Sequence, residues 1–196
     1  YEWLVSYADL KEHLRTYIFP ENKVLLVGCG NSSLSSDMYD DGFINITSID
    51  YSPVVIEKMK QKSQDRPGMK WEVMDMMDLT FDEGSFDCVL DKAAMDALMC
   101  EEGDPWNPNS EVVTSVSRMC SCISRVLRPG GVHLQISFAQ PHFRRKYLMG
   151  EHCSENYNWS FEYINLVREG GCFGHFLYIM KKQELNNINF TVSENK

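Results

Sequence analysis

Two glycines and three aspartates stand where the chemistry of this chain is expected. Gly28 and Gly30 follow a short apolar, strand-like run, and Asp50, Asp75 and Asp91 each follow a later strand-like segment. Glycine lets the backbone approach a ligand closely, and carboxylates accept hydrogen bonds from hydroxyl and amino groups. Open α/β sheets bind ligands at the carboxyl ends of their strands, so we expect these residues to share one rim.

The glycine pair differs from two common phosphate-binding loops. A dinucleotide fingerprint would place a third glycine at Ser33, and the pair is not followed by the Lys-Ser or Lys-Thr of a P-loop. Asp50, twenty residues after Gly30, is instead suited to accept both hydroxyls of a ribose, and Asp75 to accept the exocyclic amine of adenine. S-adenosylmethionine has ribose and adenine but no pyrophosphate, and its sulfonium charge favours acidic surroundings.

A parallel sheet is needed to bring these residues together. Strand-like segments alternate with helical patterns and are expected at residues 23–27, 45–49, 70–74, 86–90 and 132–138. Two more, 159–167 and 173–180, flank Glu169-Gly170-Gly171 and should form an antiparallel hairpin. The sequence therefore predicts an α/β fold: a Rossmann-like, doubly wound, mostly parallel seven-stranded sheet with a C-terminal antiparallel hairpin.

Helix signals fit the same fold. Ser52-Pro53 supplies an N-cap followed by a proline at the first helical position. The segment 112–127 is strongly amphipathic, and Arg128-Pro129-Gly130-Gly131 should stop it. Leu4, Leu10, Leu14 and Ile18 suit a helix that precedes the sheet. We expect one domain at 1–181 and a polar tail at 182–196.

Composition limits the partners. The formal net charge of −9 argues against nucleic acid and favours a basic partner, although it could simply keep the surface solvated. No apolar run approaches the roughly 20 residues of a membrane span, and no leader pattern is visible, so we expect an intracellular, cytoplasmic protein without membrane contact. Seven unpaired cysteine positions fit reduced thiols, and the five histidines lack the spacing of a metal site.

Three side chains allow two interpretations each. Tyr51 could pack on the adenine or ribose edge, or be a partly buried strand-end residue. Lys92 could orient the cofactor, or be an exposed lysine. Trp106 could flank a lysine side chain by cation–π contact, but we expect it to cover the core.

An acidic series follows the fourth predicted strand, near the expected mouth of the site. It could attract a basic substrate or form a solvated charged run. Its members are Asp91, Asp96, Glu101, Glu102 and Asp104.

Six motifs resemble those of a known family, the small lysine methyltransferases that act on translation elongation factor 1-alpha. They read VLLVGCGNSSLS, TSIDYS, WEVMD, FDCVLDK, MDAL and SRVLRPGG, and the resemblance covers most of residues 1–181. It implies S-adenosylmethionine as cofactor, S-adenosylhomocysteine as product and the elongation factor as basic protein substrate. It also implies cofactor contacts at Trp3, Gly28, Asp50, Tyr51, Asp75, Met76 and Lys92.

Methyl transfer asks the protein mainly to align two reactants and exclude water, so no dedicated nucleophile is required. Residues 90–93 lack the Asn-Pro-Pro-aromatic pattern of enzymes that methylate planar nitrogens. No catalytic proton acceptor and no oligomeric state can be assigned from the sequence. A small-molecule methyltransferase and a non-catalytic cofactor-binding domain remain as alternatives.

Overall fold

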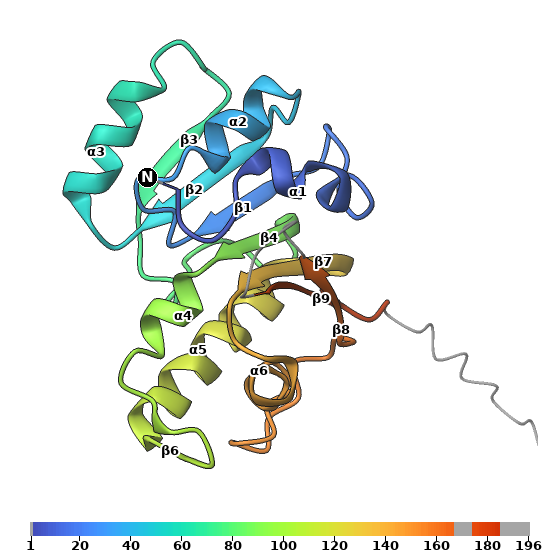
Figure 1. Ribbon diagram of the computed structural model, residues 1–196. Coiled ribbons are helices and arrows are strands. Elements are labelled where there is room, and N and C mark those ends of the chain that lie inside the picture. The colour runs from blue at the N-terminus through green and yellow to red at the C-terminus, as the bar shows by residue number, and fades with distance from the viewer. Residues whose placement is uncertain (1, 167–173, 185–196) are drawn as a thin grey trace, which may run out of the picture.

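A single seven-stranded sheet organises the computed structural model, which describes residues 2–166 and 174–184. The spatial order is β3-β2-β1-β4-β7-β9-β8, and β9 runs antiparallel to both of its neighbours (Figure 1). The strands are β1 (Val24–Val27), β2 (Ile46–Asp50), β3 (Lys70–Val73), β4 (Phe86–Lys92), β7 (Leu127–Ser137), β8 (Glu162–Leu166) and β9 (His175–Lys181). The predicted fold class, including the C-terminal antiparallel pair, is confirmed.

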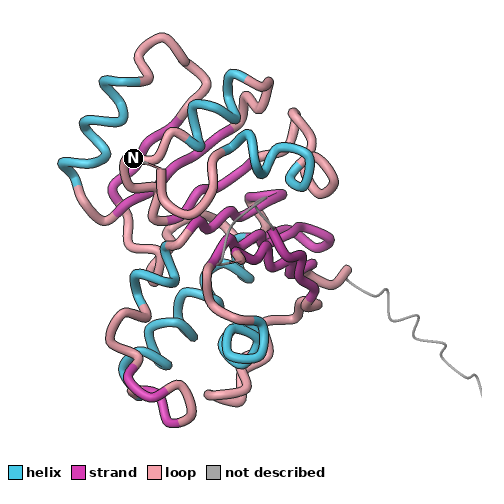
Figure 2. Tube along the Cα trace, in the orientation of Figure 1, coloured by secondary structure: helices cyan, strands magenta, loops and turns pink. Residues whose placement is uncertain are grey.

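Helices cover both faces of the sheet (Figure 2). Apolar residues of α1, α2 and α3 pack in one cluster against one face, and those of α5 and α6, with Met95 of α4, pack in a second cluster against the other. The helices are α1 (Tyr7–Leu14), α2 (Leu34–Asp40), α3 (Pro53–Lys62), α4 (Ala94–Leu98), α5 (Ser110–Val126) and α6 (Pro141–Leu148). No helix in the described ranges is long and apolar enough to cross a membrane.

The helix starts follow their local chemistry. The Ser52 side chain accepts the Val55 N–H at the start of α3, and Pro53 takes the first helical position, as predicted. Asn109 caps α5 by accepting the Glu111 N–H. The segment before the sheet forms α1, in which Leu10 and Leu14 are fully buried.

Strand β7 begins earlier than predicted. The sequence placed its start at Val132, after a stop at the Pro-Gly-Gly segment, whereas the strand begins at Leu127, which pairs with Phe86 of β4. The pairing register with β4 shifts between Phe86 and Cys88, and Gly130 takes a positive φ of 72°. The strand therefore continues through the Pro-Gly-Gly segment as an irregular stretch, although this segment has the composition of a turn.

Three short or irregular features were not predicted from the sequence. The two-residue strands β5 (Gly103–Asp104) and β6 (Asn107–Pro108) form a small antiparallel pair between α4 and α5. Helix α4 has five residues, too few to show a helical periodicity in the sequence. Helix α6 begins at Pro141, with three residues between it and the end of β7 at Ser137. The predicted hairpin turn at residues 169–171 lies outside the described residues.

Candidate functional site

Strand register brings the predicted site residues to one end of the sheet. Val27, the last residue of β1, pairs with Asp91 of β4. On the other side, Asp50 at the end of β2 pairs with Val73, the last residue of β3. Parallel strands thus end side by side at β3, β2, β1, β4 and β7, and we call this region the carboxyl end.

The two glycines have different reasons to be glycine. Gly28 has φ +56°, and a Cβ placed on it would lie 2.6 Å from the Cβ of Ala94, so the turn packs directly against the start of α4. Gly30 has φ +52° and nothing within 4 Å of its notional Cβ. Its N–H donates to Asp50 Oδ2 at 2.9 Å. The backbone at Gly30 is therefore open to a ligand.

Asp50 is fixed by the backbone alone. Its Oδ2 accepts the Gly30 N–H, and its Oδ1 accepts the Ser52 N–H at 2.9 Å. The residue is 7% exposed. Each carboxylate oxygen can accept a second hydrogen bond, so Asp50 can receive two ligand hydroxyls without giving up its backbone partners.

The β3 side of the site is open. Tyr51 is 82% exposed, so its ring is not held by packing as a buried strand-end tyrosine would be. Asp75 is exposed, and its Oδ1 accepts the Met77 N–H at 2.8 Å. Met76 is half-buried, with Sδ 3.9 Å from the notional Cβ of Gly28. These residues flank the glycine turn.

Lys92 is buried, not exposed. Its side chain is 5% exposed and forms an ion pair with Glu2, while Nζ also donates to the carbonyl of Trp3 at 3.0 Å. The indole of Trp3 is 64% exposed, so the structure brings its backbone, more than its ring, to Lys92.

Glu2 is a site residue that the sequence analysis missed. Its carboxylate accepts hydrogen bonds from Ser32 Oγ and from the Ser33 N–H, besides pairing with Lys92. Burial raises its pKa, but the hydrogen bonds from Lys92, Ser32 and Ser33 outweigh burial and hold the pKa below its usual value. The N-terminal segment is thereby tied across the glycine loop and the end of β4. No spacing rule connects residue 2 to residue 92.

Two hollows of different size border the sheet. A cavity of about 10 Å³, room for about one water, lies under the glycine turn and is lined by Gly28, Cys29, Ser32 and Lys92 among others. A larger groove of about 560 Å³ lies at the opposite end of the sheet, near Leu127. Its cations Arg125 and Lys182 already donate to backbone carbonyls.

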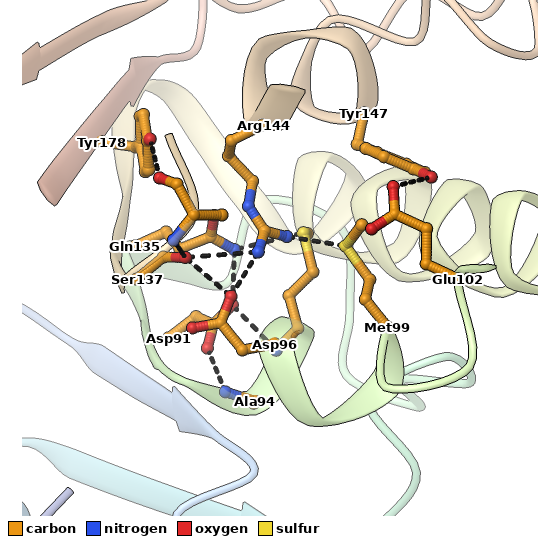
Figure 3. A network of polar contacts seen from close by, with 12 residues as sticks. Asp91, Ala94, Asp96, Met99, Glu102, Gln135, Ser137, Arg144, Tyr147 and Tyr178 are labelled. Carbon is orange, nitrogen blue, oxygen red and sulfur yellow. Dashed lines mark hydrogen bonds and ion pairs between the residues drawn. The ribbon is translucent and has the colours of Figure 1, made fainter. Parts of the chain in front are cut away.

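Two of the five residues in the predicted acidic series are not at the surface. Asp91 is fully buried and accepts from Gln135 Nε2 at 2.7 Å and from the Ala94 N–H at 2.7 Å (Figure 3). Asp96 is buried in an ion pair with Arg144. The expectation that both face the mouth was wrong, because each lies on the side of the sheet that α5 and α6 cover.

The rest of the series is divided. Glu102 accepts the hydroxyl hydrogen bond of Tyr147 at 2.7 Å, whereas Glu101 and Asp104 are exposed. Burial, opposed by the hydrogen bonds from Gln135 and Ala94, raises the pKa of Asp91 to about 6. Partners on other elements, which sequence does not reveal, decide which acids remain available.

The core-covering role expected for Trp106 was also wrong. The indole is 72% exposed on the β5–β6 turn, where Lys146 Nζ lies 4.8 Å from its ring centroid and the ring of Phe143 packs edge-on at 5.5 Å. Trp106 does form a cation–π contact, but with a lysine of its own chain.

The carboxyl end fits an adenosine-containing cation. Asp50 and Asp75 present acceptors for hydroxyl and amino groups, and the open backbone at Gly30 permits close approach. The Lys92–Glu2 ion pair lies beside the glycine loop. These acceptors and the open glycine backbone therefore fit S-adenosylmethionine.

Comparisons with known proteins agree with this cofactor assignment. A family model described as a methyltransferase domain matches residues 25–134. EEF1A lysine methyltransferase 4 of Mus musculus is 41% identical over 182 residues, covering 93% of this chain and 69% of the relative. The eEF1A lysine and N-terminal methyltransferase of Homo sapiens is 42% identical over 147 residues, covering 74% of this chain and 20% of that protein.

Solved structures share the fold. A SAM-dependent methyltransferase from Methanosarcina mazei has a TM-score of 0.63 at 18% identity, covering 88% of this chain and 97% of that one. A geranyl diphosphate C-methyltransferase from Streptomyces coelicolor, solved with S-adenosyl-L-homocysteine, has a TM-score of 0.62 at 15% identity, covering 89% of this chain and 77% of that one.

Proposed function

This chain belongs to the methyltransferase domain family and is an S-adenosylmethionine-dependent methyltransferase, and on that premise we propose that it methylates a lysine side chain of translation elongation factor 1-alpha. The observation that carries the substrate assignment is the 41% identity with an elongation-factor lysine methyltransferase over 93% of this chain. A cytoplasmic location and a single catalytic domain at 1–181 belong to the same proposal.

Within this proposal the cofactor contacts are divided along the carboxyl end. Asp50 accepts hydrogen bonds from the ribose hydroxyls, and Asp75 accepts one from the adenine amine. Tyr51 and Met76 contact the base. Gly28 and Gly30 let the backbone approach. Lys92, held by Glu2 and the Trp3 carbonyl, orients the amino acid moiety, and the segment with Trp3 closes over it. The exposed acceptors at Asp75 and the open space at Gly30 support this division.

The cofactor supplies a methyl group that is already activated by its sulfonium. The chain's own residues therefore bind, orient and exclude water. An incoming lysine must be neutral to attack, and desolvation at a mouth beside a positive charge lowers the pKa of that lysine. Exposed Phe138, which follows β7 at the carboxyl end, offers apolar surface for such desolvation.

Transfer of radiolabelled methyl from the cofactor tests this proposal. The chain would be incubated with purified elongation factor 1-alpha, with free lysine and with a panel of small amines, and labelled residues would be located by mass spectrometry. Asp50→Ala, assayed at a cofactor concentration well below its expected dissociation constant, serves as the control with reduced activity. We expect label on a lysine of the elongation factor only. Label on small amines with none on the protein would overturn the substrate assignment while leaving the fold and cofactor intact.

A further inference from the structure

A buried ion pair joins three elements behind the carboxyl end. Arg144 of α6 pairs with Asp96 of α4, and their side chains are 2% and 4% exposed. Ser137, the last residue of β7, donates to Asp96 Oδ1 at 2.6 Å and accepts from Arg144 Nη2 at 3.2 Å. One guanidinium nitrogen, Arg144 Nη2, therefore links α6 to both α4 and the end of β7 (Figure 3).

Helix α4 in turn sets the turn that reaches the site. Asp91 accepts the N–H groups of Ala94 and Met95 at the start of this helix. Ala94 packs against Gly28 closely enough to exclude a Cβ there, and Lys92 lies two residues before Ala94. A shift of α4 would move the turn against the glycine loop and move Lys92 with it.

Stability alone does not explain this pair. Among the described residues, Asp96 Oδ2 and Arg144 Nε are buried without a hydrogen-bond partner, which costs free energy. Apolar side chains of similar volume at such positions are often as stabilising as a buried ion pair, or more so. What they lack is direction, since hydrophobic contact is non-directional whereas the hydrogen bonds that Arg144 Nη2 donates to Asp96 and Ser137 require a particular distance and angle.

We propose that Arg144, acting through Asp96, is a positioning residue that holds α4 and the Lys92–Ala94 turn in the form that binds the cofactor. The inference rests on the proposed cofactor contact of Lys92 and deepens it. Arg144 itself touches neither cofactor nor substrate.

Replacing the whole pair separates positioning from stability. The double variant Asp96→Leu/Arg144→Met keeps the volume apolar, and the single variant Arg144→Met leaves a buried carboxylate unpaired. Arg128→Met is the control, because the partly exposed Arg128–Asp87 pair is also an arginine–aspartate ion pair but joins β7 to β4 at the opposite end of the sheet, away from α4. Titration calorimetry measures the dissociation constant for S-adenosylmethionine of those molecules that are folded and able to bind, which we call the competent fraction. The stoichiometry of the titration gives the size of this fraction.

We expect the competent fraction of the double variant to bind S-adenosylmethionine about tenfold more weakly than wild type, with Arg128→Met unchanged. We expect this weaker binding even if the double variant is as stable as wild type, that is, if both unfold at the same denaturant concentration. Wild-type affinity in the double variant would overturn the proposal, whatever the stability. Methylation of the elongation factor by the wild-type preparation is assayed in parallel, so a wrong substrate assignment is recognised separately.

Discussion

Four aspartates lie near the carboxyl ends of strands in one sheet, in β2 (Asp50), after β3 (Asp75), in β4 (Asp91) and in the helix α4 that follows it (Asp96), yet the structure divides them into two pairs. Among the described residues, the side chains of the rim pair, Asp50 and Asp75, accept hydrogen bonds from backbone N–H groups alone; Asp50 is itself buried, but its neighbours Tyr51 and Asp75 are exposed. The buried pair, Asp91 and Asp96, accepts from the side chains of Gln135, Ser137 and Arg144 under α5 and α6. The same residue type thus keeps free acceptor positions in one half of the sheet and is enclosed by side-chain donors in the other.

The neighbouring strand explains the difference. Asp50 lies between β1 and β3, whose ends carry glycines and exposed side chains. Asp91 lies between β1 and β7, and β7 places Gln135 opposite it. A carboxylate whose partners are backbone groups keeps lone pairs for a ligand, whereas one enclosed by side-chain donors has few left. This comparison makes predictions that separate the two pairs.

The largest expected effect is on stability at the buried pair. Asp96→Asn leaves the buried Arg144 without its counter-charge and should lower the free energy of unfolding by about 3–5 kcal/mol. The exposed counterpart Asp75→Asn should change it by less than about 0.5 kcal/mol. Urea unfolding followed by circular dichroism measures both, and similar losses for the two variants would break the comparison.

The next effect is on cofactor affinity at the rim pair. Asp50→Ala removes charged hydrogen-bond partners of the ribose, worth roughly 1.5–3 kcal/mol, so the dissociation constant for S-adenosylmethionine should rise about tenfold to a hundredfold. Calorimetric titration of the folded variant measures this rise. An unchanged constant would move the ribose site elsewhere, and tighter binding of a nicotinamide dinucleotide by wild type would overturn the cofactor fit.

A smaller effect is expected on the pH dependence of stability. Because the folded-state pKa of Asp91 is raised to about 6 from 3.8, the native state binds this proton more tightly than the unfolded state. Its contribution therefore favours the fold increasingly as pH falls from 7 to 5, by about 1 kcal/mol. The unfolding free energy of wild type minus that of Asp91→Asn should therefore increase by about 1 kcal/mol between pH 7 and pH 5.

The control has the opposite sign. Burial raises the pKa of Asp87, but the hydrogen bonds from Arg128 and the Lys23 N–H outweigh it and leave the pKa lowered. Its contribution is present above the unfolded-state pKa and is lost in acid. Asp87→Asn should therefore flatten the loss of stability at low pH. Slopes of the same sign for Asp87 and Asp91 would contradict the assignment.

The smallest effect concerns the two acids of the series that remain exposed. Glu101→Gln/Asp104→Asn should slow methylation of a basic protein about twofold to threefold at low salt and flatten its dependence on ionic strength, since exposed charges are screened within about 8–10 Å at ordinary salt. Glu102 is left unchanged because it holds Tyr147. Initial rates from 20 to about 300 mM salt measure the effect, and an equal slowing at every salt concentration would exclude steering.

Much of the fold could be predicted because its signals are local. The fully buried Val24–Val27 strand, the Ser52-Pro53 helix start and the amphipathic α5 all depend on residues close in sequence. The start of β7 was missed because Leu127 pairs with Phe86, a long-range contact that overrides the turn-like Pro-Gly-Gly segment.

The rim could be predicted in the same way, since parallel strands end together and Gly28, Gly30 and Asp50 follow such ends. The burial of Asp91 and Asp96 could not, because Asp91 is enclosed by Gln135 of β7 and Asp96 by Arg144, 48 residues beyond it. The pairing of Glu2 with Lys92 spans 90 residues and has no sequence pattern at all.

The most direct test of this division is a crystal structure of the chain with S-adenosylhomocysteine bound. The account predicts both ribose hydroxyls within hydrogen-bond distance of the Asp50 carboxylate, the adenine amine at Asp75, and Asp91 and Asp96 still enclosed by Gln135 and Arg144 without ligand contact. A ribose held away from Asp50, or a ligand atom bonded to Asp91 or Asp96, would contradict it.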